Sequence, residues 1–274
     1  MKIALAQMTS GIDPRVNAKL VSDAVAEARA GGAAMLFTPE MSGLLDRDRA
    51  RAAQRIVEEA DDPTLSAARQ AAAQHRLWVH LGSLALRRSD GRLANRGFVI
   101  DDQGVIRARY DKLHLFDVDL PTGESWRESA AYASGERAVI VEAPVGMMGL
   151  SICYDLRFPD LYRALSDAGA TVLSIPAAFT QPTGQAHWHV LMRARAIEAA
   201  AFVVAAAQTG LHEDGRATYG HSLVIDPWGS VLLDMGESAG IGFCDIDPLR
   251  VAEARARIPV LDHRRAIPTV ERCE

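Results

Sequence analysis

The sequence predicts an α/β fold in which one α/β unit occurs twice, so that two similar sheets pack together. Short apolar segments alternate with segments of helical apolar spacing along the 274 residues, which is typical of α/β proteins. Two pairs of stretches also resemble each other: ARAGGAAMLFTP at 28–39 with SDAGATVLSIP at 166–176, and FVIDDQG at 98–104 with LVIDPWG at 223–229. Because each half contains them in the same order, we expect an internal duplication within a single domain, residues 1–274.

The first half begins with an apolar strand, Lys2 to Met8, and continues with a helix from Pro14 to Ala30. Proline suits the first turn of this helix, and Gly31-Gly32 ends it. The strand Ala33 to Thr38 follows and leads into Pro39-Glu40. The remaining elements expected here are helices at 47–59 and 64–75 and strands at 77–86, 95–101 and 105–110.

The second half begins after a polar loop of about twenty residues that follows Lys112, and loops of this length are usually functional. The expected elements are strands at 137–143, 147–152, 171–175, 202–207 and 240–246, a helix after Pro159, a helix at 185–200, a hairpin at 221–234 and a short final helix.

Composition excludes several classes of protein. The chain is 49% hydrophobic and 24% charged, as in ordinary globular proteins, and its net charge of -5 without a basic stripe gives no reason to expect nucleic acid as a partner. The three cysteines, Cys153, Cys244 and Cys273, are too few and odd in number for a disulfide framework. We find no anchor or membrane-spanning run, and we expect a cytoplasmic protein without a membrane partner.

Cys153 lies between the apolar strand at 145–152 and the helix expected after Pro159. At such a strand-to-helix elbow, the backbone N–H groups of a helix start can stabilise a thiolate or an oxyanion. A lone cysteine is more often a small buried residue. Partners elsewhere in the chain are therefore needed to identify it as a nucleophile.

Glu40 and Lys112 are the candidate partners, because both also follow predicted strands. Each has a structural explanation of its own, such as a solvated Glu40 or a Lys112 paired with Asp111 or Asp117. Together with Cys153, they make chemical sense. A carboxylate beside a thiol takes its proton and returns one to a leaving nitrogen, and a lysine stabilises an oxyanion.

The chain resembles the nitrilase, or carbon–nitrogen hydrolase, superfamily over nearly its whole length. The matching blocks are FTPE at 37–40, YDKLHLF at 110–116, ICYDLRFP at 152–159, AHW at 186–188, RARAIE at 193–198 and YGHS at 219–222. The resemblance implies a four-layer α-β-β-α sandwich and a Glu40–Lys112–Cys153 triad. It also implies a second glutamate near the site, which maps onto Glu128 in WRES at 126–129, with Glu124 of the same loop as the alternative.

Within the superfamily, CYDLRF at 153–158 is similar to the small-molecule amidases, because true nitrilases usually carry Trp-Glu after the cysteine. AAAQ at 205–208, YGHS at 219–222 and DPWG at 226–229 are most similar to the deaminated-glutathione amidases. Those enzymes hydrolyse the amide of a 2-oxo-glutaramyl dipeptide. The related ω-amidases, which act on 2-oxoglutaramate, are the alternative. The resemblance also implies a homodimer.

Four further residues are candidates for substrate binding. The backbone N–H of Tyr154 is expected to stabilise the oxyanion. Arg157 either pairs with a substrate carboxylate or braces the elbow through Asp155. Phe116 and Phe179 either form walls of the pocket or belong to the core.

Other charged residues have structural explanations. Arg195 and Glu198 have the spacing of a helical ion pair, which we favour over a catalytic role. His187 and His189 point to different faces of one helix and make a poor metal pair. We expect no metal and no cofactor, since no motif for either occurs.

Two other functions compete with an amidase. A pseudoenzyme would use the same pocket to bind a metabolite or partner, but the complete triad argues against it. A redox-sensing Cys153 lacks a neighbouring resolving cysteine.

Overall fold

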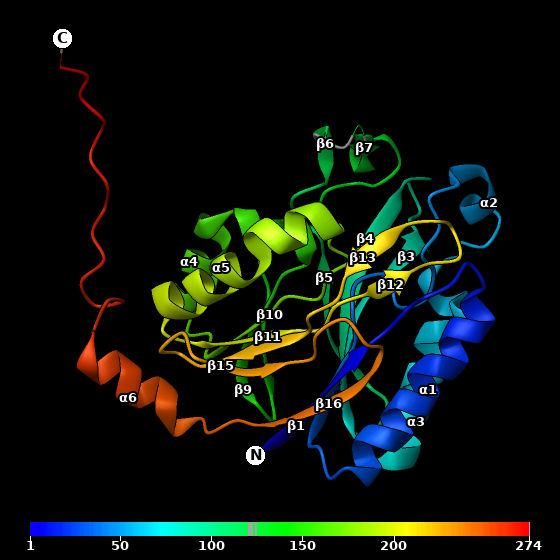
Figure 1. Ribbon diagram of the computed structural model, residues 1–274, viewed down its shortest axis with the longest axis horizontal. Coiled ribbons are helices and arrows are strands. Elements are labelled where there is room, and N and C mark those ends of the chain that lie inside the picture. Colours follow the sequence, from blue (N-terminus) through cyan, green and yellow to red (C-terminus); the bar gives the residue numbers. More distant parts are fainter. Residues whose placement is uncertain (120–122, 124, 274) are drawn as a thin grey trace.

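The computed structural model describes residues 1–119, 123 and 125–273, and it is a sandwich of four layers. Helices α1 (Pro14–Ala30) and α3 (Pro63–His75) cover one sheet, and α4 (Pro159–Asp167) and α5 (Gln181–Ala199) cover the other (Figure 1). The α-β-β-α sandwich expected from the resemblance is therefore confirmed. Glu124, the alternative to Glu128, lies outside the described residues.

The first sheet has six strands in the order β16-β1-β2-β3-β4-β5. The pairs β1–β2 and β2–β3 are parallel, and the other neighbours are antiparallel. The strands are β1 (Lys2–Gln7), β2 (Met35–Phe37), β3 (Trp78–Arg87), β4 (Leu93–Ile100), β5 (Ile106–Asp111) and β16 (Gly240–Asp245).

The second sheet repeats this plan in the order β8-β9-β10-β11-β14-β15, again with two parallel pairs between antiparallel edges. Its strands are β8 (Ile140–Ala143), β9 (Gly146–Leu150), β10 (Val172–Ser174), β11 (Phe202–Ala205), β14 (Leu223–Ile225) and β15 (Val231–Asp234). The echoing stretches at 28–39 and 166–176 contain β2 and β10, which hold equivalent positions. The stretches at 98–104 and 223–229 likewise begin in β4 and β14, which also hold equivalent positions. The internal duplication is thus visible in the topology.

Along each central strand, alternate side chains pack into two different layers of the core. In β1, Ile3 and Leu5 pack in the cluster shared with the second sheet, whereas Ala4 and Ala6 pack against the α1–α3 layer. Successive side chains of a strand point to opposite faces, so a strand apolar on both faces is buried between a sheet and a helix layer. This packing places the ends of strands from both sheets beside one another.

The largest departures from the expected elements lie in short segments. The helix expected at 47–59 is only α2 (Arg49–Ala53), capped by Asp48, followed by a 3-10 turn η1 (Glu59–Asp61). The loop after Lys112 contains β6 (Asp117–Asp119), β7 (Ser125–Arg127) and a 3-10 turn η2 (Glu128–Ala130). An unexpected hairpin joins β12 (Thr209–Leu211) to β13 (Ala217–Tyr219).

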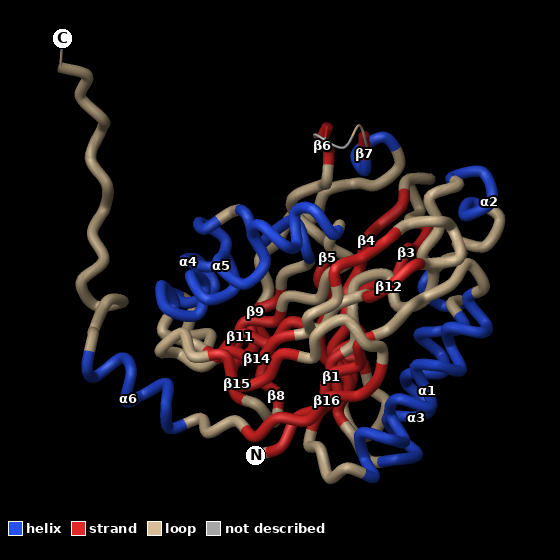
Figure 2. Tube along the Cα trace, viewed as in Figure 1, coloured by secondary structure: helices blue, strands red, loops and turns tan. Residues whose placement is uncertain are grey.

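The C-terminal segment leaves the sandwich. After α6 (Leu249–Arg257), the chain extends away from both sheets without regular structure (Figures 1 and 2). Within the described ranges, no helix combines the length and the apolar character needed to cross a membrane.

Candidate active site

A cavity of about 900 Å³ lies where the chain leaves β2, β5 and β9, and Glu40, Lys112 and Cys153 all line it. Glu40 and Lys112 follow strands of the first sheet, whereas Cys153 follows a strand of the second. The expectation of a common site at strand ends therefore holds in a modified form. The three side chains meet because two sheets pack face to face, not because they share the edge of one sheet.

Cys153 begins a 3-10 turn, η3 (Cys153–Arg157), which precedes α4. The turn separates Cys153 from the helix, which begins at Pro159 as the sequence predicted. Cys153 has a φ of 49°, in the left-handed region that non-glycine residues seldom occupy, and its N–H donates to Pro176 O at 2.9 Å. Backbone strain of this kind clusters at functional sites.

Glu40 is only 4% exposed and has every carboxylate oxygen engaged. Its Oε1 accepts hydrogen bonds from Lys112 Nζ and Asn95 Nδ2, both at 2.9 Å, and its Oε2 accepts from the N–H of Ala178 at 2.9 Å. Burial acts to raise the pKa of Glu40. The charge of Lys112 and hydrogen bonds from Cys153, Lys112 and Asn95 outweigh burial and lower that pKa below its ordinary value. Glu40 is therefore ionised at neutral pH.

Lys112 lies between two carboxylates. Its Nζ is 2.9 Å from Glu40 Oε1 and 2.9 Å from Glu128 Oε2. Burial alone would lower the pKa of Lys112, but the charges of Glu128 and Glu40 raise it well above its ordinary value. Lys112 is thus a permanent cation, and Glu128 lies beside it as expected.

Glu128 is fixed by three donors. Besides Lys112, its carboxylate accepts from the N–H of Phe116 at 2.7 Å and from Asn95 Nδ2 at 3.1 Å. The side chain of Asn95 therefore links both glutamates. Sequence reasoning missed Asn95, although a polar residue among the apolar residues of a predicted strand was a usable signal.

The surroundings of the Cys153 thiol shift its pKa upward. Burial raises its pKa well above the ordinary value, and the charge of Glu40 and a hydrogen bond to Glu40 act in the same direction, while Lys112 opposes them. A thiol whose pKa is raised by the neighbouring Glu40 carboxylate is the arrangement that a general base needs.

Asp155 joins the elbow to the residues that flank Lys112. Its Oδ2 accepts from Tyr110 Oη at 2.7 Å and from the N–H of Ile152 at 2.9 Å. Its Oδ1 lies 2.7 Å from His114 Nδ1 and accepts the backbone N–H of His114 at 3.0 Å. Because Tyr110 and His114 lie two residues on either side of Lys112, these bonds fix the lysine relative to Cys153.

Arg195 of α5 supports the elbow from the other side. Its guanidinium donates to Leu156 O at 3.1 and 3.0 Å, and it forms the expected ion pair with Glu198 at 2.7 Å. The pair predicted from helical spacing is confirmed, and its position indicates a structural role for Arg195.

All four predicted substrate-binding residues line the cavity: Phe116, Tyr154, Arg157 and Phe179. The rings of Phe116 and Tyr154 meet edge to face, with centroids 5.1 Å apart. Arg157 stands over the Phe179 ring at 5.6 Å and contacts His187 Nδ1 at 3.3 Å. The oxygens of Asp155 bind Tyr110, His114 and Ile152 instead of Arg157, so Arg157 does not brace the elbow as the second alternative required.

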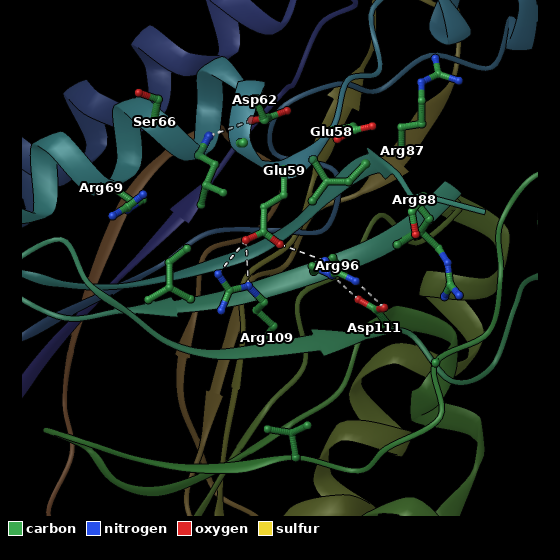
Figure 3. Close-up of a pocket in the computed structure, with 18 of the residues that line it drawn as sticks. Glu58, Glu59, Asp62, Ser66, Arg69, Arg87, Arg88, Arg96, Arg109 and Asp111 are labelled. Atoms are coloured by element: carbon green, nitrogen blue, oxygen red, sulfur yellow. Dashed lines mark hydrogen bonds and ion pairs between the residues drawn. The ribbon is translucent and has the colours of Figure 1, made fainter. Parts of the chain in front are cut away.

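A second cavity, of about 1110 Å³, lies on the opposite face of β4 and β5 (Figure 3). Four of its charged side chains pair with one another: Arg96 binds Glu59 at 2.9 Å and Asp111 at 2.6 Å, and Arg109 binds Glu59 at 2.7 Å. Arg96 follows Asn95 in β4, and Asp111 ends β5 immediately before Lys112. These ion pairs therefore hold together the two strands that carry active-site residues on their other face.

His189 does not pair with His187 but joins His221 and Asp234. Asp234 contacts His189 Nε2 at 2.9 Å and His221 Nδ1 at 2.8 Å, and one ligand atom of each lies within 4.8 Å of the others. The three side chains satisfy one another by hydrogen bonding, and sequence reasoning did not anticipate the cluster.

Comparison with known proteins agrees with this geometry. The family model for carbon-nitrogen hydrolases matches residues 2–256. The chain belongs to the carbon–nitrogen hydrolase family. The deaminated glutathione amidase of Yersinia enterocolitica is 35% identical over 271 residues, which cover 98% of this chain and 94% of the relative. The human deaminated glutathione amidase is 39% identical over 96% of this chain and 82% of its own.

Solved structures share the fold. The NitFhit protein of Caenorhabditis elegans superposes with a TM-score of 0.89 at 39% identity, over 96% of this chain and 65% of that one. A single-residue variant of an amidase from Nesterenkonia has a TM-score of 0.78 at 26% identity, over 94% and 98% of the two chains, and shows acrylamide added to its active-site cysteine. The resemblance predicted from the sequence is thus confirmed.

Proposed function

We propose that this protein is an amidase that hydrolyses a 2-oxo acid amide of the deaminated-glutathione type through a thioester on Cys153. The observation that carries the proposal is the buried network in which Glu40 contacts both the thiol and Lys112, while Glu128 holds Lys112 from the other side. Relatives bearing the name deaminated glutathione amidase support the choice of substrate.

In the first step, Cys153 Sγ attacks the amide carbon, and the thiol proton passes to Glu40. Among the described residues, Oε1 of Glu40 accepts two of the bonds above and Oε2 only one, which leaves Oε2 better placed to receive the proton. The carbonyl electrons move to oxygen. An ammonium has three N–H bonds, and the bonds of Lys112 to Glu40 and Glu128 leave one for that oxyanion. The N–H of Tyr154 is the proposed second donor.

The tetrahedral intermediate then re-forms its carbonyl and breaks the C–N bond. The leaving nitrogen takes the proton from Glu40, because an amide anion is a very poor leaving group. Water attacks the resulting thioester while Glu40 takes its proton. Collapse of the second intermediate releases the acid, and the departing sulfur recovers the proton from Glu40.

The charge of the cavity supports an acidic substrate. Among the described lining residues, six are cations and three are carboxylates. The cations are Arg47, Arg49, Lys112, Arg127, Arg157 and Arg216, and the carboxylates are Glu40, Asp46 and Glu128. We assign Arg157 to the carboxylate of the acyl half, which both candidate substrates share.

The deciding experiment compares kcat/KM for deaminated glutathione and for 2-oxoglutaramate on one preparation, with a nitrile as a third compound. A preference for deaminated glutathione supports the proposal, and a preference for 2-oxoglutaramate makes the protein an ω-amidase. Absence of turnover on every compound, with Cys153 intact, favours the metabolite-binding pseudoenzyme. Stoichiometric alkylation distinguishes an amidase from a redox sensor. An amidase loses one thiol and all of its turnover together.

We further propose that the protein is a single-domain cytoplasmic homodimer. The segment 258–273 supports self-association, since it extends from the sandwich with Ile267 and Val270 76% and 87% exposed. Light scattering after size exclusion tests this proposal for the full chain and for a chain ending at residue 257. A monomeric mass for the full chain would contradict it.

A further inference from the structure

Two buried hydrogen-bond donors in the active-site cavity have no partner among the residues that the structure describes. Arg216, in the turn between β12 and β13, and Trp126 of β7 both line the cavity. Within the described part of the chain, neither Arg216 Nε nor Trp126 Nε1 finds an acceptor. The guanidinium carbon of Arg216 lies 4.4 Å from the centroid of the Trp126 ring. The two unpaired donors therefore lie on neighbouring side chains in the same part of the cavity.

The internal contacts of Arg216 leave its Nε without an acceptor among the described residues. Arg216 Nη2 lies 3.4 Å from Asp214 Oδ2. The Asp214 carboxylate already accepts the backbone N–H groups of Arg47 at 2.7 Å and of Arg216 at 2.9 Å. Burial lowers the pKa of Arg216, and the charges of Asp214 and Glu40 oppose that effect. A buried donor without an acceptor is costly, and for a guanidinium facing a cavity the natural acceptor is a ligand anion.

The position of Arg216 relates it to the leaving group. A row of rings runs from the nucleophile: Tyr154 to Phe116 at 5.1 Å, Phe116 to Trp126 at 6.4 Å, and then Arg216 over Trp126. Arg157 instead lies over Phe179, so the two arginines serve different parts of the cavity. Arg216 lines the same cavity as Glu40, the group that protonates the leaving nitrogen in the proposed mechanism.

We propose that Arg216 and Trp126 form a second carboxylate-binding subsite, which takes the free C-terminal carboxylate of a dipeptide leaving group. This inference rests on the proposed function and sharpens it. A 2-oxo-glutaramyl dipeptide carries one carboxylate on each side of the scissile amide, whereas 2-oxoglutaramate releases ammonia and has only the first. The subsite therefore accounts for selection of the larger substrate.

The test measures binding separately from turnover. In a Cys153→Ala background, calorimetry compares deaminated glutathione with its terminal carboxamide, which differs only in the second carboxylate. We expect the carboxamide to bind about 10- to 100-fold more weakly, the range for a charge-assisted hydrogen bond. Adding Arg216→Gln should remove that difference. Adding Trp126→Phe, which deletes only one N–H donor and keeps most of the ring, should reduce it.

Arg127→Gln is the matched control. Arg127 lines the same cavity, but its guanidinium already binds both oxygens of Asp119, at 2.9 and 2.8 Å. The control should keep the preference for the carboxylate, whereas a general effect of positive charge would reduce it as much as Arg216→Gln does.

Equal affinity for the two ligands overturns the subsite, and this comparison needs no change at Arg216. A preference that survives Arg216→Gln also overturns it. Turnover by the wild-type protein is read independently. If deaminated glutathione binds with the expected preference but is not hydrolysed, the proposed function fails while the subsite stands. If neither ligand binds, both fail.

Discussion

Lys112 and Glu128 form a 2.9 Å ion pair that is almost closed to solvent, the two side chains being 2% and 12% exposed. Glu128 also accepts the N–H of Phe116, which lines the cavity. The ion pair therefore fixes the lysine and the aromatic wall relative to each other. Because Glu128 also pairs with Lys112, the ammonium keeps a charged partner when Glu40 takes the proton of Cys153 and becomes neutral.

Glu128→Gln keeps the shape of the side chain and removes its charge. We expect kcat to fall by about 10- to 100-fold with a smaller change in KM, because removing a group that orients a catalytic residue typically has this effect. Steady-state kinetics on the best 2-oxo amide checks the result. Glu124→Gln is the control for the alternative assignment from the sequence, and a larger loss there would reverse the roles of the two glutamates.

Asn95→Ala should also lower kcat, by about tenfold, since it removes the hydrogen bonds to Glu40 and Glu128 and leaves both carboxylates less well oriented. Asn95→Asp should be worse, because it places a third carboxylate beside these two. If Asn95→Asp retained wild-type kcat, the proposed positioning role of Asn95 would be wrong.

The pH profile of kcat/KM should be flat between about pH 5 and pH 9. The lowered pKa of Glu40 puts the acid limb below the ordinary range of a glutamate, and the raised pKa values of Cys153 and Lys112 put the alkaline limb above the ordinary range of a thiol. A limb near pH 8.5 would instead indicate a thiol of ordinary pKa.

The ion pair of Glu40 with Lys112 also makes the stability of the fold depend on pH. The lowered pKa of Glu40 stabilises the fold above the unfolded-state pKa, and that stability is lost as the pH falls through the folded-state value. The raised pKa of Lys112 stabilises the fold below its unfolded-state pKa, and that stability is lost as the pH rises. Circular dichroism across this range separates unfolding from titration of the active site.

Much of the fold could be predicted because local signals agreed with the tertiary structure. The helix Pro14–Ala30 has the expected bounds, since Pro14 starts it and Gly31 caps it. The echoes at 98–104 and 223–229 predicted the duplication because each contains the end of a strand, β4 or β14, that holds an equivalent position in its sheet. The helix at 47–59 was wrong because Asp48 caps only a short turn that ends at Ala53.

The triad was predictable because its residues carry reactive groups. Glu40, Lys112 and Cys153 are reactive groups at strand ends, so their meeting could be inferred. Asn95 lies within a strand, and Arg216 lies in the turn of a hairpin whose strands have only three residues each. Nothing local shows that this turn reaches the cavity, since its position depends on how the second sheet packs on the first.

Arg195→Met should destabilise the protein by about 1–3 kcal/mol, because it leaves the buried Leu156 carbonyl without its two donors. Thermal and urea unfolding measure the loss. Glu198→Gln is the matched control: Glu198 is exposed, so breaking its pair with Arg195 should cost little by comparison. A similar loss for both variants would show that the ion pair, not the carbonyl contact, supports the elbow.

Cys153→Ser should fold as the wild type and turn over at least 100-fold more slowly, because an alcohol is far harder to deprotonate than a thiol in this buried site. The pKa of Cys153 is already raised by burial and by Glu40, so even the thiol depends on proton transfer during attack. Rapid quenching of the wild-type reaction, followed by peptide mass spectrometry, should find the 2-oxo acyl group on Cys153. Wild-type turnover by the serine variant, or an acyl group on the buried Cys244 instead, would exclude the thioester mechanism.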